Sequence, residues 1–446
     1  MTFPKDFVWG TATSAYQIEG GGLDFGRGEC IWHRFSHTSG KVRNGDTGEV
    51  ACDHIHRYPQ DVAMMSQLGI DGYRFSVSWP RVIPAGTGTI NQQGLDFYKR
   101  LIEKLHQAHI TPYLTLYHWD LPQALQDQGG WENPDSVHWY TEYADLVSRE
   151  LGSEVKQWTT FNEPFVSSIV GNLFGVHAPG KQDPVAAFTV AHHLLLSHGS
   201  AVPIIRQNVP DAQVGITLDL AYSQPYRPEN TDDQIAARHF AILHNNWFLD
   251  PVFRGAYPAD GVKWLEPLGA LSNIDLSEIG KAQVPIDFLG INYYTRHLAK
   301  ATDANPMGYE FVRAEGNEHT ALDWEVYPDG LLHTLLYVHN GYYPSKIFIT
   351  ENGCNYDDPE PANGVVDDPK RVAYYRQHID AVEKAIALGV PVKGYFAWSL
   401  MDNFEWAEGY QSRFGLYYVD FATQERTPKK SALYYQDRIS QERAKA

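Results

Sequence analysis

Lys346-Ile-Phe-Ile-Thr-Glu-Asn-Gly353 is the stretch from which both the fold and the chemistry of this chain can be inferred. Residues 347–350 are apolar or β-branched, which predicts a buried strand. Asn352-Gly353 is a chain-breaking pair, so Glu351 is expected where the strand ends. A carboxylate at the tip of a core strand loses water and must find partners or change its pKa. Taken alone, such a glutamate more often faces solvent.

A second stretch repeats the pattern and favours a functional role for the glutamate over simple exposure to solvent. Gln157-Trp-Thr-Thr-Phe-Asn-Glu-Pro164 has an apolar and β-branched run, then Asn162-Glu163, then a proline that ends the strand. Two glutamates at strand tips are what a two-carboxylate mechanism requires.

Strand-like runs alternate with helical patterns along the whole chain. Apolar residues recur at helical spacing in the intervening segments, for example in 91–109 and 369–388. Alternation of this kind predicts an α/β fold with a parallel sheet, and eight units predict a closed (β/α)8 TIM barrel. We predict a single domain over residues 1–446, with extended βα loops near 20–52, 165–184, 295–325 and 402–425. The eight strand-like runs, some with the turn that follows, lie within residues 7–19, 72–79, 111–119, 157–164, 212–220, 286–294, 346–353 and 392–401.

The barrel prediction places function at the carboxyl ends of the strands. Polar and aromatic residues are concentrated at those predicted ends, which favours a site at one rim. They are Gln17, Arg74, His118, Trp119, Asn162, Glu163, Asn292, Tyr294, Glu351 and Trp398.

Composition excludes several kinds of partner. The net charge of -18 provides no basic surface for nucleic acid or an anionic membrane. No apolar run approaches the length of about 18 residues typical of a membrane helix. The aromatic content of 13%, with 12 Trp and 27 Tyr, favours an aromatic-lined cavity. The face of a sugar ring is a suitable partner for such aromatic side chains.

The cysteines and the first residues point to the compartment. Cys30, Cys52 and Cys354 form an odd, unclustered set from which no disulfide framework or zinc spacing can be inferred. The segment Cys52-Asp-His-Ile-His56 fits no standard zinc pattern, so we predict no metal and no cofactor. The start of the chain lacks a basic region followed by a long apolar run. We therefore expect a cytoplasmic protein, either a monomer or a homo-oligomer.

The two glutamate stretches resemble the signature motifs of glycoside hydrolase family 1, the β-glucosidases. Five further segments match that family in order, so the resemblance covers essentially the whole chain. They are Phe7-Val-Trp-Gly-Thr-Ala-Thr-Ser-Ala-Tyr-Gln-Ile-Glu-Gly20, Tyr73-Arg-Phe-Ser-Val-Ser-Trp-Pro-Arg81, Leu116-Tyr-His-Trp-Asp-Leu-Pro122, Gly290-Ile-Asn-Tyr-Tyr294 and Trp398-Ser-Leu-Met-Asp-Asn-Phe-Glu-Trp406.

The resemblance implies a retaining mechanism, in which the two carboxyl groups lie about 5–5.5 Å apart. It assigns Glu351 as nucleophile and Glu163 as acid/base, with Arg74 and Tyr294 contacting the nucleophile and Asn162 at the sugar's 2-hydroxyl. Burial and the charge of Glu351 should raise the pKa of Glu163, so that it holds a proton. The predicted substrate-binding set is Gln17, His118, Trp119, Asn162, Asn292, Tyr294, Trp324, Trp398, Glu405, Trp406 and Phe414.

Glu405 carries the substrate prediction. An acidic group beside the sugar's 4- and 6-hydroxyls accepts their hydrogen bonds and repels a phosphate there. The 6-phosphoglycosidases of the family carry a phosphate-binding Ser/Lys/Tyr set that Asn403-Phe-Glu-Trp406 lacks. We therefore predict a small neutral β-glycoside as partner, with glucosides first and galactosides and fucosides as further candidates.

Some positions depart from the family pattern, and some alternatives stay open. Asp219 stands where many relatives have Asn, and Leu322-Asp-Trp-Glu-Val-Tyr327 differs slightly from the usual run. These positions are expected on the leaving-group side, with Val166, Leu173 and His177. The alternatives are a transglycosidase with the same mechanism, which sequence does not separate from a hydrolase, and a non-catalytic sugar-binding barrel, which we disfavour because both glutamates are present.

Overall fold

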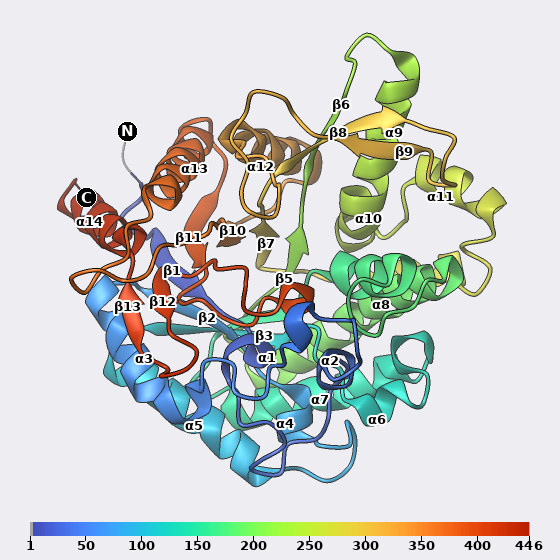
Figure 1. The fold of residues 1–446 in the computed structure, drawn as a ribbon. Helices are drawn as coiled ribbons and strands as arrows, with labels where there is room; N and C mark the ends of the chain where they lie inside the picture. The colour runs from blue at the N-terminus through green and yellow to red at the C-terminus, as the bar shows by residue number, and fades with distance from the viewer. Residues whose placement is uncertain (1–2, 446) are drawn as a thin grey trace.

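The computed structural model of the protein describes residues 3–445 and contains a closed barrel of eight parallel strands (Figure 1). Around the barrel the strand order is β1-β11-β10-β7-β5-β4-β3-β2. The predicted (β/α)8 barrel is therefore confirmed. Its strands are β1 (Val8–Ala12), β2 (Gly72–Ser76), β3 (Thr111–Tyr117), β4 (Gln157–Asn162), β5 (Gln213–Asp219), β7 (Phe288–Asn292), β10 (Ile347–Asn352) and β11 (Val392–Trp398).

Strand β10 is longer than its sequence predicts. We expected Glu351 just where the strand ends, yet the ladder continues through Asn352, with Glu351 opposite Asn292 and Asn352 opposite Ala397. A register shift lies between Ile349 and Glu351, so the pairing is irregular just before the buried carboxylate.

Helices surround the barrel (Figure 1). In α5 (Gln92–Gln107), the predicted apolar face is the buried one, because Leu95, Tyr98, Leu101, Ile102 and Leu105 are all enclosed. The longer helices are α3 (His54–Leu68), α5 (Gln92–Gln107), α7 (Ser136–Leu151), α8 (Pro184–Asn208), α9 (Thr231–Ala241), α10 (Trp247–Arg254), α12 (Pro328–Tyr342), α13 (Pro369–Ala387) and α14 (Lys430–Lys445).

Helix α8 corrects one statement made from the sequence. Its 25 residues are long and apolar enough to meet a length-and-composition criterion for a membrane span, although the sequence was expected to hold no such stretch. Within the most apolar 18-residue segment of α8, 89% is buried inside the protein. The apolar composition of α8 is therefore that of a core helix, which needs apolar residues on every side.

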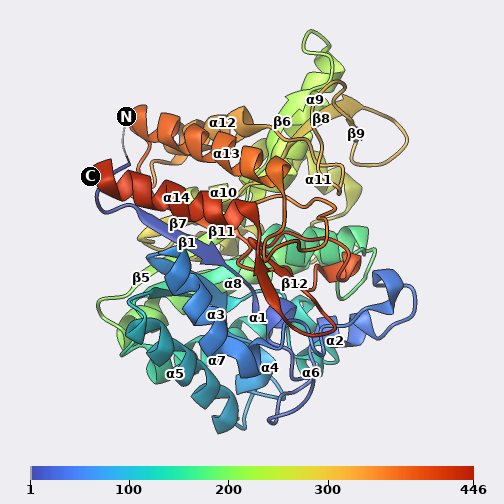
Figure 2. The same cartoon turned by 60° about the vertical axis from the view of Figure 1, so that its left-hand side comes forward.

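Shorter elements elaborate the loops at the carboxyl ends of the strands. A three-stranded sheet that was not predicted stands beside the barrel next to α9 (Figures 1 and 2). Its strands are β6 (Tyr222–Pro225), β8 (Arg296–Ala301) and β9 (Tyr309–Val312), and β12 (Tyr417–Val419) pairs with β13 (Arg426–Pro428). The short helices are α1 (Ala15–Ile18), α2 (Ile31–Ser36), α4 (Trp79–Val82), α6 (Gln123–Gln126), α11 (Ala259–Leu265) and the π-helix Val166–Phe174.

An aromatic cluster occupies the barrel interior beneath the carboxyl ends of the strands. Tyr113, Phe288, Phe348 and Phe396 come from four different strands and pack edge to face. Trp398 and Phe414 belong to the same cluster and also reach the cavity above it. This packing closes the interior to water, so polar groups at the rim rest on an apolar base.

Candidate active site

Glu351 lies at the end of β10 with its two oxygens bound by different donors. Arg74, from β2, donates from Nη1 to Oε1 at 2.5 Å, and the Tyr294 hydroxyl donates to Oε2 at 2.6 Å. The glutamate is buried, with 3% of its surface exposed. A cation and a hydroxyl both favour the ionised form, as a nucleophile requires.

Glu163 follows β4 and has different surroundings. Its carboxylate accepts a hydrogen bond from Asn292 Nδ2 at 2.6 Å. Thr350 Oγ1 donates to Asn292 Oδ1 at 2.7 Å, which directs the amide nitrogen of Asn292 toward Glu163. The neutral amide stabilises a carboxylate less than the guanidinium at Glu351 does.

Asn162 connects the two carboxylates. Its Oδ1 accepts from Arg74 Nη2 at 2.6 Å and from Asn292 Nδ2 at 3.1 Å. Arg74 and Asn292 therefore each contact one glutamate and Asn162 at the same time. This continuous chain of hydrogen bonds fixes the relative positions of the two catalytic candidates.

The two carboxyl groups titrate differently because their neighbours differ. Burial raises the pKa of Glu163 well above its usual range, and the charges of Asp219 and Glu351 add to the rise. Burial also raises the pKa of Glu351, but the charge of Arg74 and the hydrogen bond from Tyr294 oppose it. We therefore place the proton of the pair on Glu163, in agreement with the sequence prediction.

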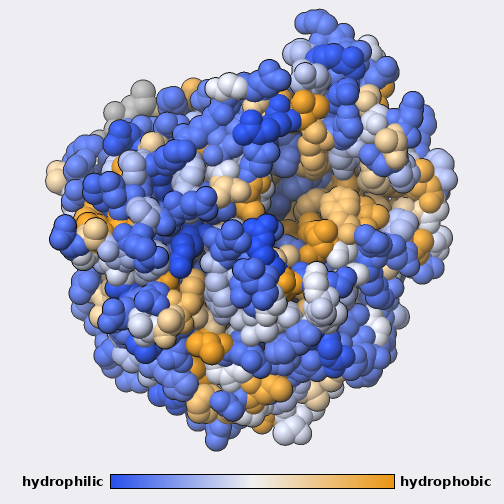
Figure 3. All heavy atoms as spheres, viewed as in Figure 1, coloured by the Kyte–Doolittle hydropathy of each residue, from blue (hydrophilic) through white to orange (hydrophobic). Residues whose placement is uncertain are grey.

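A cavity of about 370 Å³ opens above these groups and is visible as a hollow in Figure 3. Both glutamates line it, and its remaining surface is largely aromatic, as a site for a sugar ring requires. The predicted substrate residues that line it are His118, Trp119, Tyr294, Trp324, Trp398, Glu405, Trp406 and Phe414.

Four predicted site residues lie behind this lining. Arg74, Asn162 and Asn292 are buried and hold the carboxylates as described above. Gln17 Nε2 donates to Phe404 O at 3.0 Å and to Glu405 Oε2 at 3.3 Å, so it positions Glu405. These four residues therefore orient the groups that line the cavity.

The sequence analysis treated Glu405 as negatively charged, and the structure changes that expectation. Burial raises the pKa of Glu405 to about 8, with a further contribution from the charge of Glu351. At pH 7 this carboxyl is therefore mainly protonated, whereas the sequence argument for exclusion of phosphate relied on its negative charge. Discrimination against a phosphate stays a prediction, and it now depends more on the missing phosphate-binding side chains than on repulsion.

Several lining residues were not found from the sequence. Phe165, Val170 and Val176 come from the segment that follows β4, and Ala407 and Glu408 come from the loop after β11. Val166 and His177 line the cavity as expected, whereas Leu173 is not among the lining residues. Loop residues follow no periodic pattern, so their order in the sequence did not indicate which ones face the cavity.

Asp219 also lines the cavity, at the end of β5. Its Oδ2 lies 3.0 Å from His244 Nε2, and β5 places Asp219 opposite Asn292 in the barrel ladder. The sequence marked Asp219 as a departure from the family pattern but offered no signal for His244, which lies within a predicted helix. A third carboxylate thus stands near Glu163 with a histidine behind it.

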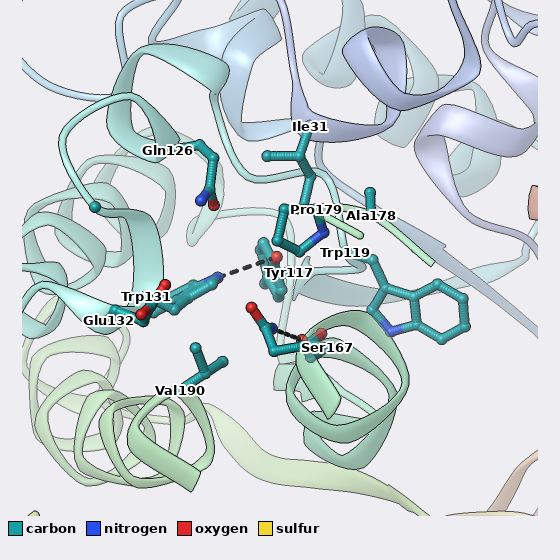
Figure 4. Close-up of a pocket in the computed structure, with 12 residues that line it drawn as sticks. Ile31, Tyr117, Trp119, Gln126, Trp131, Glu132, Ser167, Ala178, Pro179 and Val190 are labelled. Carbon is teal, nitrogen blue, oxygen red and sulfur yellow. Dashed lines mark hydrogen bonds between the residues drawn. The ribbon is translucent and has the colours of Figure 1, made fainter. Parts of the chain in front are cut away.

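Trp119 also borders a second, much smaller cavity (Figure 4). It is bordered by Tyr117, Trp131 and Ser167, and Trp131 Nε1 donates to the Tyr117 hydroxyl at 3.1 Å. Its free volume is about 10 Å³, which is room for roughly one water molecule. It is too small for a sugar, so we assign substrate binding to the larger cavity.

Comparison with known proteins identifies the family. The model of glycosyl hydrolase family 1 matches residues 1–444. This chain belongs to glycosyl hydrolase family 1. Within the family it is 47% identical over 436 residues to Beta-glucosidase A of Thermotoga maritima, covering 97% of this chain and 96% of the relative. It is 46% identical over 440 residues to the 1,4-beta-D-glucan glucohydrolase of Thermotoga neapolitana, covering 98% of both.

Solved structures of family 1 members agree with this assignment. The family 1 β-glucosidase from Thermotoga maritima in complex with isofagomine lactam superimposes with a TM-score of 0.95 at 45% identity, covering 98% of each chain. The same enzyme in complex with castanospermine gives a TM-score of 0.94 at 44% identity, again covering 98% of each chain. The resemblance described from the sequence is thereby confirmed at the level of the family.

Proposed function

We propose that the protein is a retaining β-glucosidase. It hydrolyses terminal non-reducing β-D-glucosyl residues from cellobiose, short oligosaccharides and aryl β-glucosides, with β-galactosides and β-fucosides as further candidate substrates. One observation carries the proposal: two buried glutamates face the same aromatic cavity with opposite partners, a cation and a hydroxyl at Glu351 but a neutral amide at Glu163. Family membership and the names of the relatives support the substrate class.

The first step forms a covalent intermediate. A carboxylate oxygen of Glu351 attacks the anomeric carbon while the bond from that carbon to the leaving oxygen breaks. The proton on Glu163 moves to the leaving oxygen, so the aglycone departs as a neutral alcohol or phenol. Asn162 is the candidate for the 2-hydroxyl contact that strengthens in the transition state.

The second step uses the loss of one charge. When Glu351 has become an ester, its charge no longer raises the pKa of Glu163, which becomes a stronger acid and is ionised. Glu163 then takes a proton from the incoming water, the water oxygen bonds to the anomeric carbon, and Glu351 leaves as a carboxylate. Two inversions at one carbon give net retention.

The decisive experiment combines substrates and variants. Nitrophenyl β-glucoside, β-galactoside, β-fucoside and 6-phospho-β-glucoside are tested with the wild type, Glu351→Gly and Glu163→Ala, and proton NMR follows the configuration of the first product. We expect turnover of the neutral glycosides with retention. Inverted product from the wild type, or turnover of the 6-phosphoglucoside alone, would refute the proposal.

The variants test the two roles separately. Glu351→Gly should be inactive, and azide should restore release of nitrophenol with an inverted glycosyl azide as product. Glu163→Ala should still release nitrophenol in a rapid first phase but then stall, because no base activates water. Normal turnover by either variant contradicts its role. Sugar–sugar products that dominate at high acceptor concentration would indicate the transglycosidase instead.

We also propose that the enzyme acts in the cytoplasm on short glucosides derived from polysaccharides such as cellulose. Cys30, Cys52 and Cys354 are all free and buried, which suits a reducing compartment. The glucan glucohydrolase name of one relative supports a polysaccharide-derived substrate. Cell fractionation tests the location, and a comparison of cellobiose with longer cello-oligosaccharides tests the substrate.

A further inference from the structure

Two histidines and a glutamate meet on the outer surface of α2, away from the catalytic cavity. His33 lies within α2, His37 follows its last turn, and Glu49 comes from the loop that leads to α3. One possible ligand atom from each residue lies within 4.8 Å of the other two. The rings of His33 and His37 are 4.3 Å apart between centroids, so the two imidazoles pack against each other.

The hydrogen bonds of His37 determine which of its nitrogens is available. Nδ1 lies 2.7 Å from the carbonyl oxygen of His33, and because a carbonyl can only accept, Nδ1 carries the proton. In the neutral ring Nε2 then presents a lone pair, and it lies 3.3 Å from Glu49 Oε1. Two acceptors therefore face each other across a gap, an arrangement that a bound cation stabilises.

The spacing of this pair suits a metal ion. Ligand atoms about 2.0–2.1 Å from a tetrahedral ion are separated from one another by about 3.3–3.4 Å. His37 Nε2 and Glu49 Oε1 already have this separation. A bond from the other ring nitrogen to a backbone carbonyl is also the usual support of a metal-binding histidine.

We propose that His33, His37 and Glu49 bind a divalent transition-metal ion of the zinc class, with water completing the coordination. Two imidazoles and one carboxylate favour zinc and its neighbours over magnesium or calcium, which prefer sets of oxygen ligands. The sequence predicted no metal because Cys52-Asp-His-Ile-His56 fits no zinc pattern, and His33, His37 and Glu49 were not considered together.

The position of this site links it to the substrate cavity. Trp32, on the inner face of the same helix, is fully buried and packs against Trp406 at 4.6 Å and against His177 at 5.2 Å. Trp406 and His177 both line the cavity. An ion that links α2 to the loop at Glu49 therefore stabilises the position of Trp32. Through Trp32 it supports the two cavity residues that Trp32 contacts, Trp406 and His177.

Isothermal titration with zinc chloride tests the proposal on protein dialysed first against EDTA. We expect one saturable site in the wild type and at least about a tenfold weaker affinity in His33→Gln and His37→Gln, since loss of even a supporting group costs that much. The matched control is His138→Gln on α7. His138 Nε2 also lies 3.3 Å from a glutamate, Glu142, but the structure describes no third ligand there.

Thermal unfolding provides the second measurement. Zinc should raise the Tm of the wild type and of His138→Gln but not that of His37→Gln, and magnesium chloride should have no such effect. His37 is exposed and His33 is half-buried, so both variants should fold, and retained nitrophenyl glucosidase activity checks this. Absence of saturable binding in the wild type overturns the proposal. Equal zinc affinity in the wild type and the His33 and His37 variants also overturns it.

Discussion

Tyr294→Phe isolates one of the two contacts that keep Glu351 ionised. The hydroxyl donates to Glu351 Oε2 at 2.6 Å, and Phe retains the ring that packs against Trp324 and Phe414. Arg74 and its bond to Oε1 stay in place. The substitution therefore removes a single hydrogen bond to a buried carboxylate with little change in packing.

The size of the effect follows from the strength of that bond. A hydrogen bond to a charged group contributes about 1.5–3 kcal/mol. Because one pKa unit corresponds to about 1.36 kcal/mol, its loss should raise the pKa of Glu351 by about 1–2 units. The ionised nucleophile then predominates only at higher pH, so the acid limb of kcat/KM should move toward neutral pH by that amount.

The assay is kcat/KM for nitrophenyl β-glucoside from pH 4 to 9, with the released nitrophenol measured after alkaline quenching. Tyr435→Phe is the matched control, because its buried hydroxyl donates to the backbone carbonyls of Gly10 at 2.9 Å and Tyr395 at 3.2 Å and to neither glutamate. It should lower stability without moving either limb. An unchanged acid limb in Tyr294→Phe would refute the role of the hydroxyl in ionising Glu351.

Three further predictions concern other titratable groups. Asp219→Asn removes a charge that raises the pKa of Glu163, so the basic limb of kcat/KM should move to lower pH; an unmoved limb contradicts this. Lys429→Met leaves two buried aspartates without their ammonium partner and should cost about 3–5 kcal/mol in urea unfolding, against less than about 0.5 kcal/mol for exposed Lys430→Met. Glu405 has a folded pKa raised to about 8, so its contribution to stability falls as pH rises toward that value. Glu405→Gln should therefore raise Tm relative to the wild type more at pH 8 than at pH 5, and an equal difference at both would contradict the shifted pKa.

The location of the proposed catalytic pair could be inferred from the sequence alone. Alternating strand and helix patterns imply a parallel barrel, and a barrel brings the carboxyl ends of all its strands to one rim. Glu163 and Glu351 are far apart in sequence, yet their strand-tip positions were enough to place them together. The ordered family motifs then indicated the reaction, because they cover nearly the whole chain.

The partners of these groups were decided by the tertiary structure. That Asn162 connects Arg74 and Asn292, that His244 stands behind Asp219, and that Glu49 lies beside His37 all depend on how loops and strands pack. The same is true of protonation, since the pKa of Glu405 rises with burial by loop residues that follow no periodic pattern. The point at which an apolar run stops in the sequence determines which residue occupies the end of a strand, whereas desolvation and hydrogen bonding depend on neighbours that are distant in the chain. The sequence by itself therefore determined where the chemistry takes place, and the folded structure decided the charge of each group there.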